Sequence, residues 1–506
     1  MRLSKDRGAI DEVSSRCPQC GRAAPAAVFA REGRVYQQSR CPRHESSEAL
    51  IFSDSDLYRR LDGWNDLIFN AANANGEPRS GPDDLPSPSL AVIDITNRCN
   101  FRCPVCFVEA DGHGSRYFLD LNLVRGMLQT LVARPVPCRH IQFSGGEPTL
   151  HPEFPAILRA SRELGFTHIQ VATNGSRMVD ADYVRLCEDS GLHTLYLQFD
   201  AIDDDVYLKL RGQRLLDNKI RAVENVARTN MRLVLVPTVA SSVNVDQIGP
   251  IFRFALEHSK HVTGISIQPA ANVGRVEVDS GESEPFNLAM MAKEFGEQTG
   301  LTRFPDDWFP LNAVSLIGRA VNNLRGDPSL AAACDAHCSL GTYFYIDDNN
   351  KPTCINRFLD LEGFFERLSE VAPAADRGKL GRRISQIQEI ARLSQCFDGE
   401  RAPEGLTFQR LLRGLDGWED KSCGRSPRWY RRGFNGIFVA GMHFMDARSY
   451  NLRRLRRCII QYVTMSGDLI PFCSYNAGAR LRSAEESARI EQTRPARTAN
   501  PTARLE

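Results

Sequence analysis

Short runs of apolar residues recur between residues 90 and 275, and amphipathic segments separate them. The apolar runs are 90–96, 140–144, 167–173, 194–200, 232–239 and 264–269. Helical periodicity marks the segments 118–133, 153–164, 180–190, 215–228 and 246–258. Strands that are apolar throughout, rather than at every second residue, are typical of parallel sheets covered by helices. The pattern therefore predicts an α/β fold whose core, residues 90–275, is a partial (β/α)6 TIM-like barrel.

The pattern changes on both sides of this core. Residues 1–55 are predicted to form a small metal-binding domain, and a linker rich in Pro, Gly, Ser and Asp follows at 75–90. Beyond the core we expect a helical bridge over 276–330 and an irregular, cysteine-rich domain over 331–482. The tail 483–506 is polar and is predicted to be disordered.

Composition and charge narrow the class of protein. The chain of 506 residues is too long for one ordinary core, and its 42% hydrophobic and 25% charged residues are typical of a soluble protein. A net charge of +1 gives no overall attraction to nucleic acid, which we do not expect as a partner. No apolar run approaches the roughly 18 residues of a membrane span, and the N-terminus lacks the apolar core of a secretory signal. We expect a cytoplasmic location, where a content of 15 cysteines indicates metal ligands rather than a disulfide framework, although Cys138 and Cys187 are expected to be structural.

Three cysteines, Cys99, Cys103 and Cys106, follow the first predicted strand directly. A [4Fe-4S] cluster normally takes one cysteine per iron, so three cysteines leave one iron without a protein ligand. Catalytic metal sites keep an open coordination position, whereas structural sites are closed. The spacing therefore predicts a catalytic cluster at the carboxyl end of the strand, where α/β barrels place their chemistry.

Polar residues follow the later strands at the same expected edge. They are Gly145, Gly146 and Glu147 after the second strand, Thr173 and Asn174 after the third, Gln198 and Asp200 after the fourth, and Gln268 at the end of the sixth. Glycines at a strand end let a ligand approach the backbone, and a glutamate can bind an ammonium group. Taken singly, the later motifs are also explained by ordinary turns, and the cysteine triplet by half of a zinc site.

In this order and spacing, the motifs resemble the radical S-adenosylmethionine (SAM) enzymes, whose defining motif is Cys-x3-Cys-x2-Cys. The resemblance implies that SAM chelates the free iron and that the Gly-Gly-Glu turn contacts its amino group. One-electron reduction, with a flavodoxin- or ferredoxin-like donor, then cleaves SAM to methionine and a 5′-deoxyadenosyl radical. Val105 stands where the family often has an aromatic residue, and we expect Phe107 to shield the cluster instead.

Two pairs of metal-ligating residues lie within residues 1–55. They are Cys17 and Cys20, then Cys41 and His44. Their spacing is typical of a tetrahedral mononuclear site, which four protein ligands would close. A segment of this length is too short for a stable core of its own, so a metal ion would stabilise it. We predict a structural zinc or iron ion, against the alternative that the residues are close only by chance.

Seven cysteines lie beyond residue 330, and six of them are predicted ligands of one or two auxiliary [4Fe-4S] clusters. The six are Cys334, Cys338, Cys354, Cys396, Cys458 and Cys473. Cys423 is left out because its surroundings are basic and loop-like. Two predicted hairpins, 343–354 and 462–473, each deliver a cysteine from the second strand. The first hairpin and the cysteines before it resemble the auxiliary-cluster domains attached to many radical SAM enzymes.

A narrower resemblance joins both ends of the chain. Together with the N-terminal pairs, the motifs His443-Phe444-Met445-Asp446, Arg457-Cys458 and Pro471-Phe472-Cys473-Ser474-Tyr475-Asn476 resemble the archaeal tetraether lipid synthase family, formerly interpreted as pterin methyltransferases. The resemblance implies abstraction of hydrogen from the terminal methyl group of a lipid chain. It also implies carbon–carbon coupling of the alkyl radical, held by an auxiliary cluster, to a second chain. Modification of a pterin or a peptide stays open, as does a non-catalytic iron–sulfur electron carrier or nucleic-acid binder.

A basic and aromatic segment, 421–434, bears on the choice of substrate. Residues 401–460 hold 13 Lys and Arg but 5 Asp and Glu, and arginines alternate with Trp429 and Tyr430. This mixture suits peripheral contact with anionic lipid head groups at the inner face of a membrane. It equally suits RNA, or a solvated basic face near cluster ligands, so it is compatible with a lipid substrate without establishing one.

Overall fold

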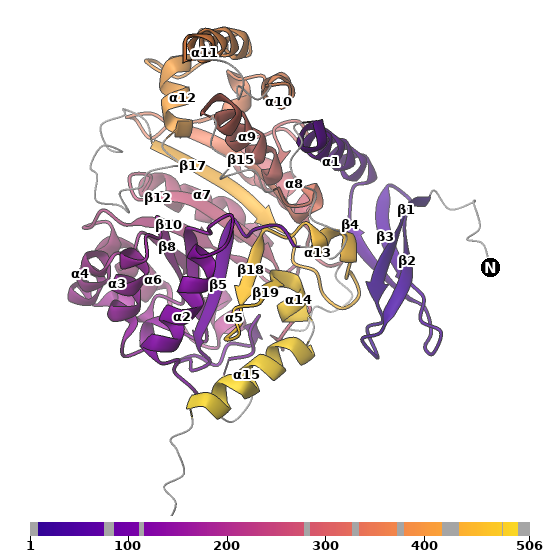
Figure 1. Cartoon of the computed structure of the whole chain (residues 1–506), viewed down its shortest axis with the longest axis vertical. Coiled ribbons are helices and arrows are strands. Elements are labelled where there is room, and N and C mark those ends of the chain that lie inside the picture. Colours follow the sequence, from indigo (N-terminus) through magenta and orange to yellow (C-terminus); the bar gives the residue numbers. More distant parts are fainter. Residues whose placement is uncertain are drawn as a thin grey trace, which may run out of the picture.

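The computed structural model describes residues 9–74, 85–110, 116–277, 284–325, 333–371, 379–416, 435–477 and 479–493. A curved sheet surrounded by helices forms the main body, and a small separate sheet stands beside it (Figure 1). Within the described residues, no helix is both long and apolar enough to cross a membrane.

Six parallel strands form the core of the main body, side by side in the order of the sequence. They are β5 (Leu90–Thr96), β7 (His140–Gly145), β8 (His168–Thr173), β9 (Thr194–Gln198), β10 (Arg232–Val236) and β12 (Val262–Pro269). The helices between them are α2 (Leu121–Val132), α3 (Phe154–Glu163), α4 (Ala181–Ser190), α5 (Asp204–Arg211), α6 (Leu216–Val226) and α7 (Ile248–Glu257). The predicted partial (β/α)6 barrel is confirmed, and α5 is the one helix of this group that the apolar pattern missed.

Burial explains why the strands are apolar throughout. Six of the seven residues of β5 are buried, because helices cover its outer face and other side chains fill the barrel at its inner face. Aspartates begin several of the covering helices. The carboxylate of Asp180, for example, accepts hydrogen bonds from the backbone N–H groups of Asp182 and Tyr183 at the start of α4.

The C-terminal region adds a parallel strand to each edge of this core. β17 (Asn435–Met442) pairs with β12, and β18 (Ile460–Val463) pairs with β5. Eight parallel strands therefore run in the order β18-β5-β7-β8-β9-β10-β12-β17. The region is less irregular than expected, because both strands find their partners far away in the sequence. The segment 443–459, which contains α13 (Leu452–Arg456), connects the two edges.

The remaining elements surround the core. Both predicted hairpins form, from β15 (Ser339–Ile346) with β16 (Pro352–Cys354) and from β18 with β19 (Leu469–Pro471). The small sheet consists of β1 (Ala9–Arg16), β2 (Ala23–Arg31), β3 (Arg34–Ser39) and β4 (Ser47–Phe52). The other helices are α1 (Ser55–Ala74), α8 (Leu288–Thr299), α9 (Val314–Arg325), α10 (Leu361–Ser369), α11 (Lys379–Ser394), α12 (Phe408–Asp416) and α14 (Phe472–Ala477).

The start of the predicted disordered tail is helix α15 (Ala479–Thr493), which lies below the barrel in Figure 1. Arg489 is fully buried and donates hydrogen bonds to the Asp94 carbonyl at 2.6 Å and to the Tyr117 hydroxyl at 3.2 Å. Arg482 lies 3.0 Å from the Asp94 carboxylate. The prediction of disorder was wrong for this helix, because its polar composition includes two arginines that bind buried groups of the core: Arg482 the carboxylate of Asp94, and Arg489 its backbone carbonyl.

Candidate functional site

The cysteine triplet lies in the loop after β5, and two arginines hold the backbone of this loop. Arg211, at the end of α5, donates from Nη1 to the Val105 carbonyl at 2.7 Å. Arg275 donates to the carbonyls of Cys103 at 3.1 Å and of Ala110 at 3.2 Å. The loop is therefore shaped by the protein itself, which fixes where its three thiols can bind a cluster.

The three thiols fit an iron–sulfur cluster in their chemistry and in their placement. Cys99, Cys103 and Cys106 line one cavity together with the Gly-Gly-Glu turn. Burial above all, together with the charges of Glu147, Cys103 and Cys106, raises the pKa of Cys99 to about 12. Three half-buried thiols around one cavity are the soft ligands that iron takes in such a cluster.

The glycines of the turn make room for protein backbone. A Cβ atom on Gly145, whose φ is +126°, would lie 2.0 Å from the Thr96 carbonyl oxygen, and one on Gly146 would lie 2.2 Å from that of Arg98. The N–H groups of Gly146 and Glu147 donate to these two carbonyls at 2.8 and 2.7 Å. The space on the Cβ side of both glycines thus fastens β7 to the start of the cysteine loop. Both glycines also line the cavity, and the approach of a ligand to their backbone stays a prediction.

Glu147 is buried under the turn and is already held by protein donors. Its Oε1 accepts from the Thr149 backbone at 3.1 Å, the Thr149 hydroxyl at 2.5 Å and the Thr173 hydroxyl at 2.7 Å, and its Oε2 accepts from the Asn174 N–H at 2.7 Å. Burial raises the pKa of Glu147, and these hydrogen bonds oppose the rise. The carboxylate joins the ends of β7 and β8, and Oε2 keeps acceptor capacity for a ligand's ammonium group.

Asp200 does not line the cavity, although the sequence predicted it there. It is fully buried and forms a bidentate pair with Arg211, with both N–O distances 2.8 Å. Burial would raise the pKa of Asp200, but the charge and hydrogen bonds of Arg211 outweigh burial and lower it. Asp200 thus orients the arginine that holds the cysteine loop.

Lys219, from α6, is a second buried cation behind the predicted contact residues. Its ammonium group donates to the Asn174 carbonyl at 2.6 Å and to Gln198 Oε1 at 3.1 Å. Burial lowers its pKa to about 8. Lys219 thereby fixes the ends of β8 and β9, where the sequence placed contacts to the cofactor.

The cavity has a volume of about 230 Å³ and mixes polar and aromatic linings. The strands contribute the polar side chains of Gln142, Tyr196, Gln198 and Gln268. Three rings, which we call the aromatic wall, also line it: Phe107, Phe444 and Phe472. Their centroids are 5.2 Å apart for Phe107 and Phe444, 5.6 Å for Phe107 and Phe472, and 4.9 Å for Phe444 and Phe472.

The aromatic wall connects the triplet to a second group of cysteines. Phe107 follows Cys106 in the chain, and Phe472 precedes Cys473. The Met445 N–H, next to Phe444, lies 3.5 Å from the sulfur of Cys473. Phe107 and Phe472 are thus neighbours of a cysteine in the chain, and Phe444 precedes the residue whose N–H group contacts Cys473.

Four C-terminal cysteines make up this second group, here called the four-cysteine set. They are Cys334, Cys338, Cys458 and Cys473. Burial raises the pKa of each thiol, to about 12 for Cys458 and about 11 for Cys473, and their charges influence one another. Four half-buried cysteines, which offer thiol ligands alone, suit an iron–sulfur cluster.

Cys354 and Cys396 lie apart from this set. Cys354 is buried at the end of β16 beside the Thr342 hydroxyl, 3.4 Å away, and Cys396 is buried in the apolar core before α12. The charges around these two thiols come from arginines and aspartates rather than from other cysteines. The structure therefore does not bring them into a ligand group, although their hairpin and spacing predicted one. Cys423 and the basic segment 421–434 lie outside the described residues.

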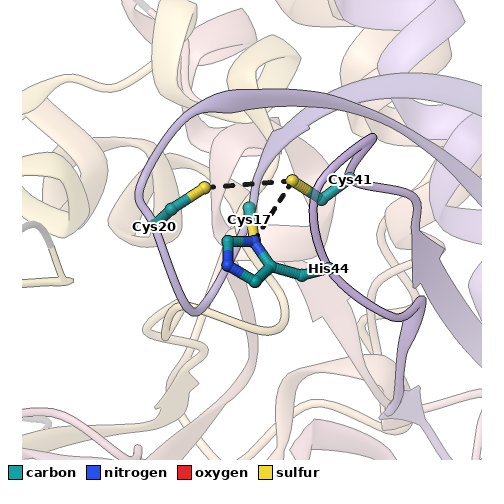
Figure 2. A group of neighbouring side chains, drawn as sticks. All are labelled: Cys17, Cys20, Cys41 and His44. Atoms are coloured by element: carbon teal, nitrogen blue, oxygen red, sulfur yellow. Dashed lines mark hydrogen bonds between the residues drawn. The ribbon is translucent and has the colours of Figure 1, made fainter.

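The N-terminal pairs converge as the sequence predicted. Figure 2 shows Cys17, Cys20, Cys41 and His44, whose ligand atoms all lie within 4.8 Å of one another. The Cys20 and Cys41 sulfurs are 3.8 Å apart, and His44 Nδ1 lies 3.5 Å from the sulfurs of Cys17 and Cys41. A tetrahedral site with metal–sulfur bonds of about 2.3 Å gives about 3.8 Å between sulfurs and about 3.5 Å from sulfur to nitrogen. The group fits a closed mononuclear site, and it is the one such group within the part of the chain described.

Several residues of the site escaped sequence analysis. Arg211 and Lys219 look like ordinary charged positions of amphipathic helices, and Arg275 lies beyond the last predicted strand. Their roles depend on backbone carbonyls elsewhere in the fold, which no local pattern reveals. Phe444 and Phe472 were found only as parts of the C-terminal motifs, without a position relative to the triplet.

Comparison with known proteins gives two family models that match parts of the chain, and individual proteins and structures that resemble it. Residues 93–255 match the radical SAM superfamily, and residues 9–53 match the HMPTM N-terminal zinc ribbon domain. A Methanocaldococcus jannaschii protein named 7,8-dihydro-6-hydroxymethylpterin dimethyltransferase is 31% identical over 471 residues, which cover 91% of this chain and 92% of that protein. A Saccharolobus solfataricus protein named "Probable GTP 3′,8-cyclase" is 26% identical over 201 residues, 40% of this chain and 58% of that one. Among solved structures, Streptococcus suis SuiB bound to S-adenosylmethionine has a TM-score of 0.36 and 18% identity, covering 45% of this chain and 49% of SuiB.

Proposed function

Since the chain belongs to the radical SAM superfamily, in the family of the Methanocaldococcus jannaschii protein named as a pterin dimethyltransferase, we propose that this radical SAM enzyme couples lipid alkyl chains through a new carbon–carbon bond. Cys99, Cys103 and Cys106 would hold the [4Fe-4S] cluster, and the ends of β7, β8, β9 and β12 would hold SAM. The four-cysteine set would hold an auxiliary [4Fe-4S] cluster.

The observation that carries this proposal is the aromatic wall. An unactivated alkyl chain offers no hydrogen-bonding group, so only apolar side chains can position it. Phe107, Phe444 and Phe472 provide such a surface, which adjoins Cys106 of the triplet at Phe107 and Cys473 of the four-cysteine set at Phe472. A chain lying along these rings would reach from the place where hydrogen is removed to the second redox centre.

When bound, the cluster and SAM supply a 5′-deoxyadenosyl radical, which is strong enough to abstract hydrogen from a methyl group. The residues of the chain bind, orient and exclude water: Glu147 and Asn174 at the polar end of the cavity, and the aromatic wall at the apolar end. Coupling joins two methyl carbons and removes one hydrogen from each. Two SAM molecules and two electrons from a low-potential donor are consumed, and two molecules each of methionine and 5′-deoxyadenosine are formed.

The test is release of 5′-deoxyadenosine by the anaerobically reconstituted and reduced enzyme. SAM would be offered with membrane lipid extract, with pterins or with a peptide pool, and products would be examined by mass. We expect lipid alone to stimulate release, with two 5′-deoxyadenosines per coupled pair of chains. Stimulation by pterin alone or by peptide alone would assign the substrate to that class instead of to the lipids. The assignment of the SAM-cleaving site would still stand.

Modification of a pterin is the second candidate, favoured by the printed name of the M. jannaschii relative. The polar groups of Gln142, Tyr196 and Gln268 would pair with the edge of a pterin ring, and the aromatic wall would stack on its face. Replacing Phe472 by Leu separates the two candidates. Leucine keeps an apolar surface for an alkyl chain but removes ring stacking, so lipid-dependent release would persist and pterin-dependent release would fall.

Two partners belong to the proposal. A flavodoxin- or ferredoxin-like protein would supply the electrons, because each SAM molecule that is cleaved consumes one electron. Segment 421–434, outside the described residues, would contact anionic head groups and bring the enzyme to its substrate. Sedimentation with anionic and with neutral vesicles tests the second point, and equal binding to both would remove the basic segment from the proposal.

A further inference from the structure

Arg454 is a buried cation beside the four-cysteine set. It lies in α13, and 6% of its surface is exposed. Its Nη2 donates to the Cys338 sulfur at 3.4 Å and to the His443 carbonyl at 3.1 Å. Its Nε is buried without a hydrogen-bond partner.

The other charges near this set are already balanced. Asp335, which is fully buried, pairs with His337 at 2.9 Å and with Arg457 at 2.9 Å. Arg453, the neighbour of Arg454 in α13, pairs with Asp11 and is partly exposed. Within the described residues, Arg454 has no carboxylate within ion-pair distance. A buried charge without a counter-ion is costly, so an anion at this position is expected.

The four-cysteine set can supply that anion. A [4Fe-4S] cluster with four thiolate ligands carries net negative charge, and its charge grows by one when the cluster is reduced. Arg454 donates directly to one of the four sulfurs, whereas Arg457 is committed to Asp335. The unpaired cation and the four thiols therefore complement each other.

We propose that Arg454 is a positioning residue that serves as counter-ion to the auxiliary cluster and sets its reduction potential. The inference rests on the proposed function, because it requires a cluster on the four-cysteine set. A cation hydrogen-bonded to a ligand sulfur stabilises the reduced cluster more than the oxidised one. Loss of the cation therefore moves the midpoint potential to a more negative value and makes electron transfer into this cluster harder.

The experiment is a redox titration of the full-length protein followed by electron paramagnetic resonance. A background with Cys99, Cys103 and Cys106 changed to Ala leaves the auxiliary cluster as the reporter. Arg454→Gln removes the charge and replaces the guanidinium donors by an amide, and Arg454→Lys keeps the charge. Arg453→Gln is the matched control, since it removes the same charge from the adjacent residue of the same helix without a sulfur contact.

We expect Arg454→Gln to shift the midpoint to a more negative potential, Arg454→Lys to shift it less, and Arg453→Gln to leave it unchanged. An intact cluster with the same potential in the Arg454→Gln and Arg453→Gln proteins would overturn the inference and leave the proposed function standing. If the Arg454→Gln protein binds no cluster, the Arg454→Lys protein serves as the test. A midpoint potential more negative than that of the background protein would support the inference, and an unchanged midpoint potential would overturn it. A background protein without iron on the four-cysteine set would overturn both the cluster assignment and the inference.

Discussion

The triplet and the four-cysteine set both adjoin the aromatic wall, at Phe107 and at Phe472, and the chain builds them in opposite ways. The triplet occupies eight consecutive residues of one loop, from Cys99 to Cys106. The four-cysteine set collects its members from a stretch of 140 residues, Cys334 to Cys473. Arginines fasten the backbone of the first group, whereas β-strand pairing and α13 bring the second together.

The two groups differ in their number of ligands, three against four, and each number suits a different kind of metal centre. Three ligands on one loop would leave one iron of a bound [4Fe-4S] cluster without a protein ligand, as a catalytic centre requires. Four ligands from separate elements would close an auxiliary cluster and tie those elements to one another, as a structural or electron-transferring centre requires. Both groups have a member next to a ring of the aromatic wall in the chain, Cys106 beside Phe107 and Cys473 beside Phe472.

The largest effect is expected from breaking the triplet. Cys103→Ala removes one of three thiols, so the catalytic cluster is lost and SAM cleavage falls to background. Release of 5′-deoxyadenosine and iron per chain measure this, with a loss of about four irons. Cys187→Ala is the control, since this fully buried cysteine of α4 lies outside both groups. Normal cleavage in Cys103→Ala would defeat the assignment of the triplet.

Removing one ligand of the four-cysteine set should affect the auxiliary centre without affecting SAM cleavage at the triplet. Cys473→Ser is expected to lower iron by about four atoms per chain while SAM cleavage persists, because the triplet keeps its own ligands. Product formation should stop although 5′-deoxyadenosine is still released. Iron analysis beside a cleavage assay tests this, and unchanged iron would make Cys473 a packing residue.

A smaller effect is expected where the triplet meets SAM. Glu147→Ala removes the acceptor that joins Thr173 and Asn174 to the turn, together with a contact proposed for the SAM ammonium group. Losing a charged hydrogen bond costs about 1.5–3 kcal/mol, so SAM affinity should fall roughly 10- to 100-fold with the cluster retained. Equilibrium dialysis measures the affinity, and the exposed Glu153→Ala is the control. Equal affinities in both variants would remove Glu147 from the SAM site.

The same contrast explains what could be predicted from the sequence. The strands of the core and the triplet were predictable because their signals are local: apolar runs of five to eight residues and a fixed cysteine spacing. The N-terminal ligands were also local pairs, and they converge as predicted. Composition alone misjudged α15, because the partner of Arg489 lies almost 400 residues earlier.

Long-range placement could not be derived in the same way. The pairing of β17 with β12 and of β18 with β5 decides which C-terminal cysteines meet, and no local pattern encodes it. The role of Asp200 depends on Arg211, which lies on a helix that the apolar pattern missed. Glycines 145 and 146 were correctly placed, but whether ligand or backbone fills their space is a property of the folded chain.

The smallest effect is expected from two cysteines that belong to neither cysteine group. Cys354 and Cys396 were predicted ligands, but the structure packs them into the core, away from the four-cysteine set. Cys354→Ala and Cys396→Ala should therefore leave iron per chain and both cluster signals unchanged. Each should lower the free energy of unfolding by about 1 kcal/mol, as is usual for a small change in a buried side chain. Denaturant unfolding and iron analysis are the measurements, and Cys473→Ser is the positive control. A loss of about four irons in either alanine variant would mean that the four-cysteine set does not hold all the auxiliary iron, and that a second auxiliary cluster uses a hairpin cysteine.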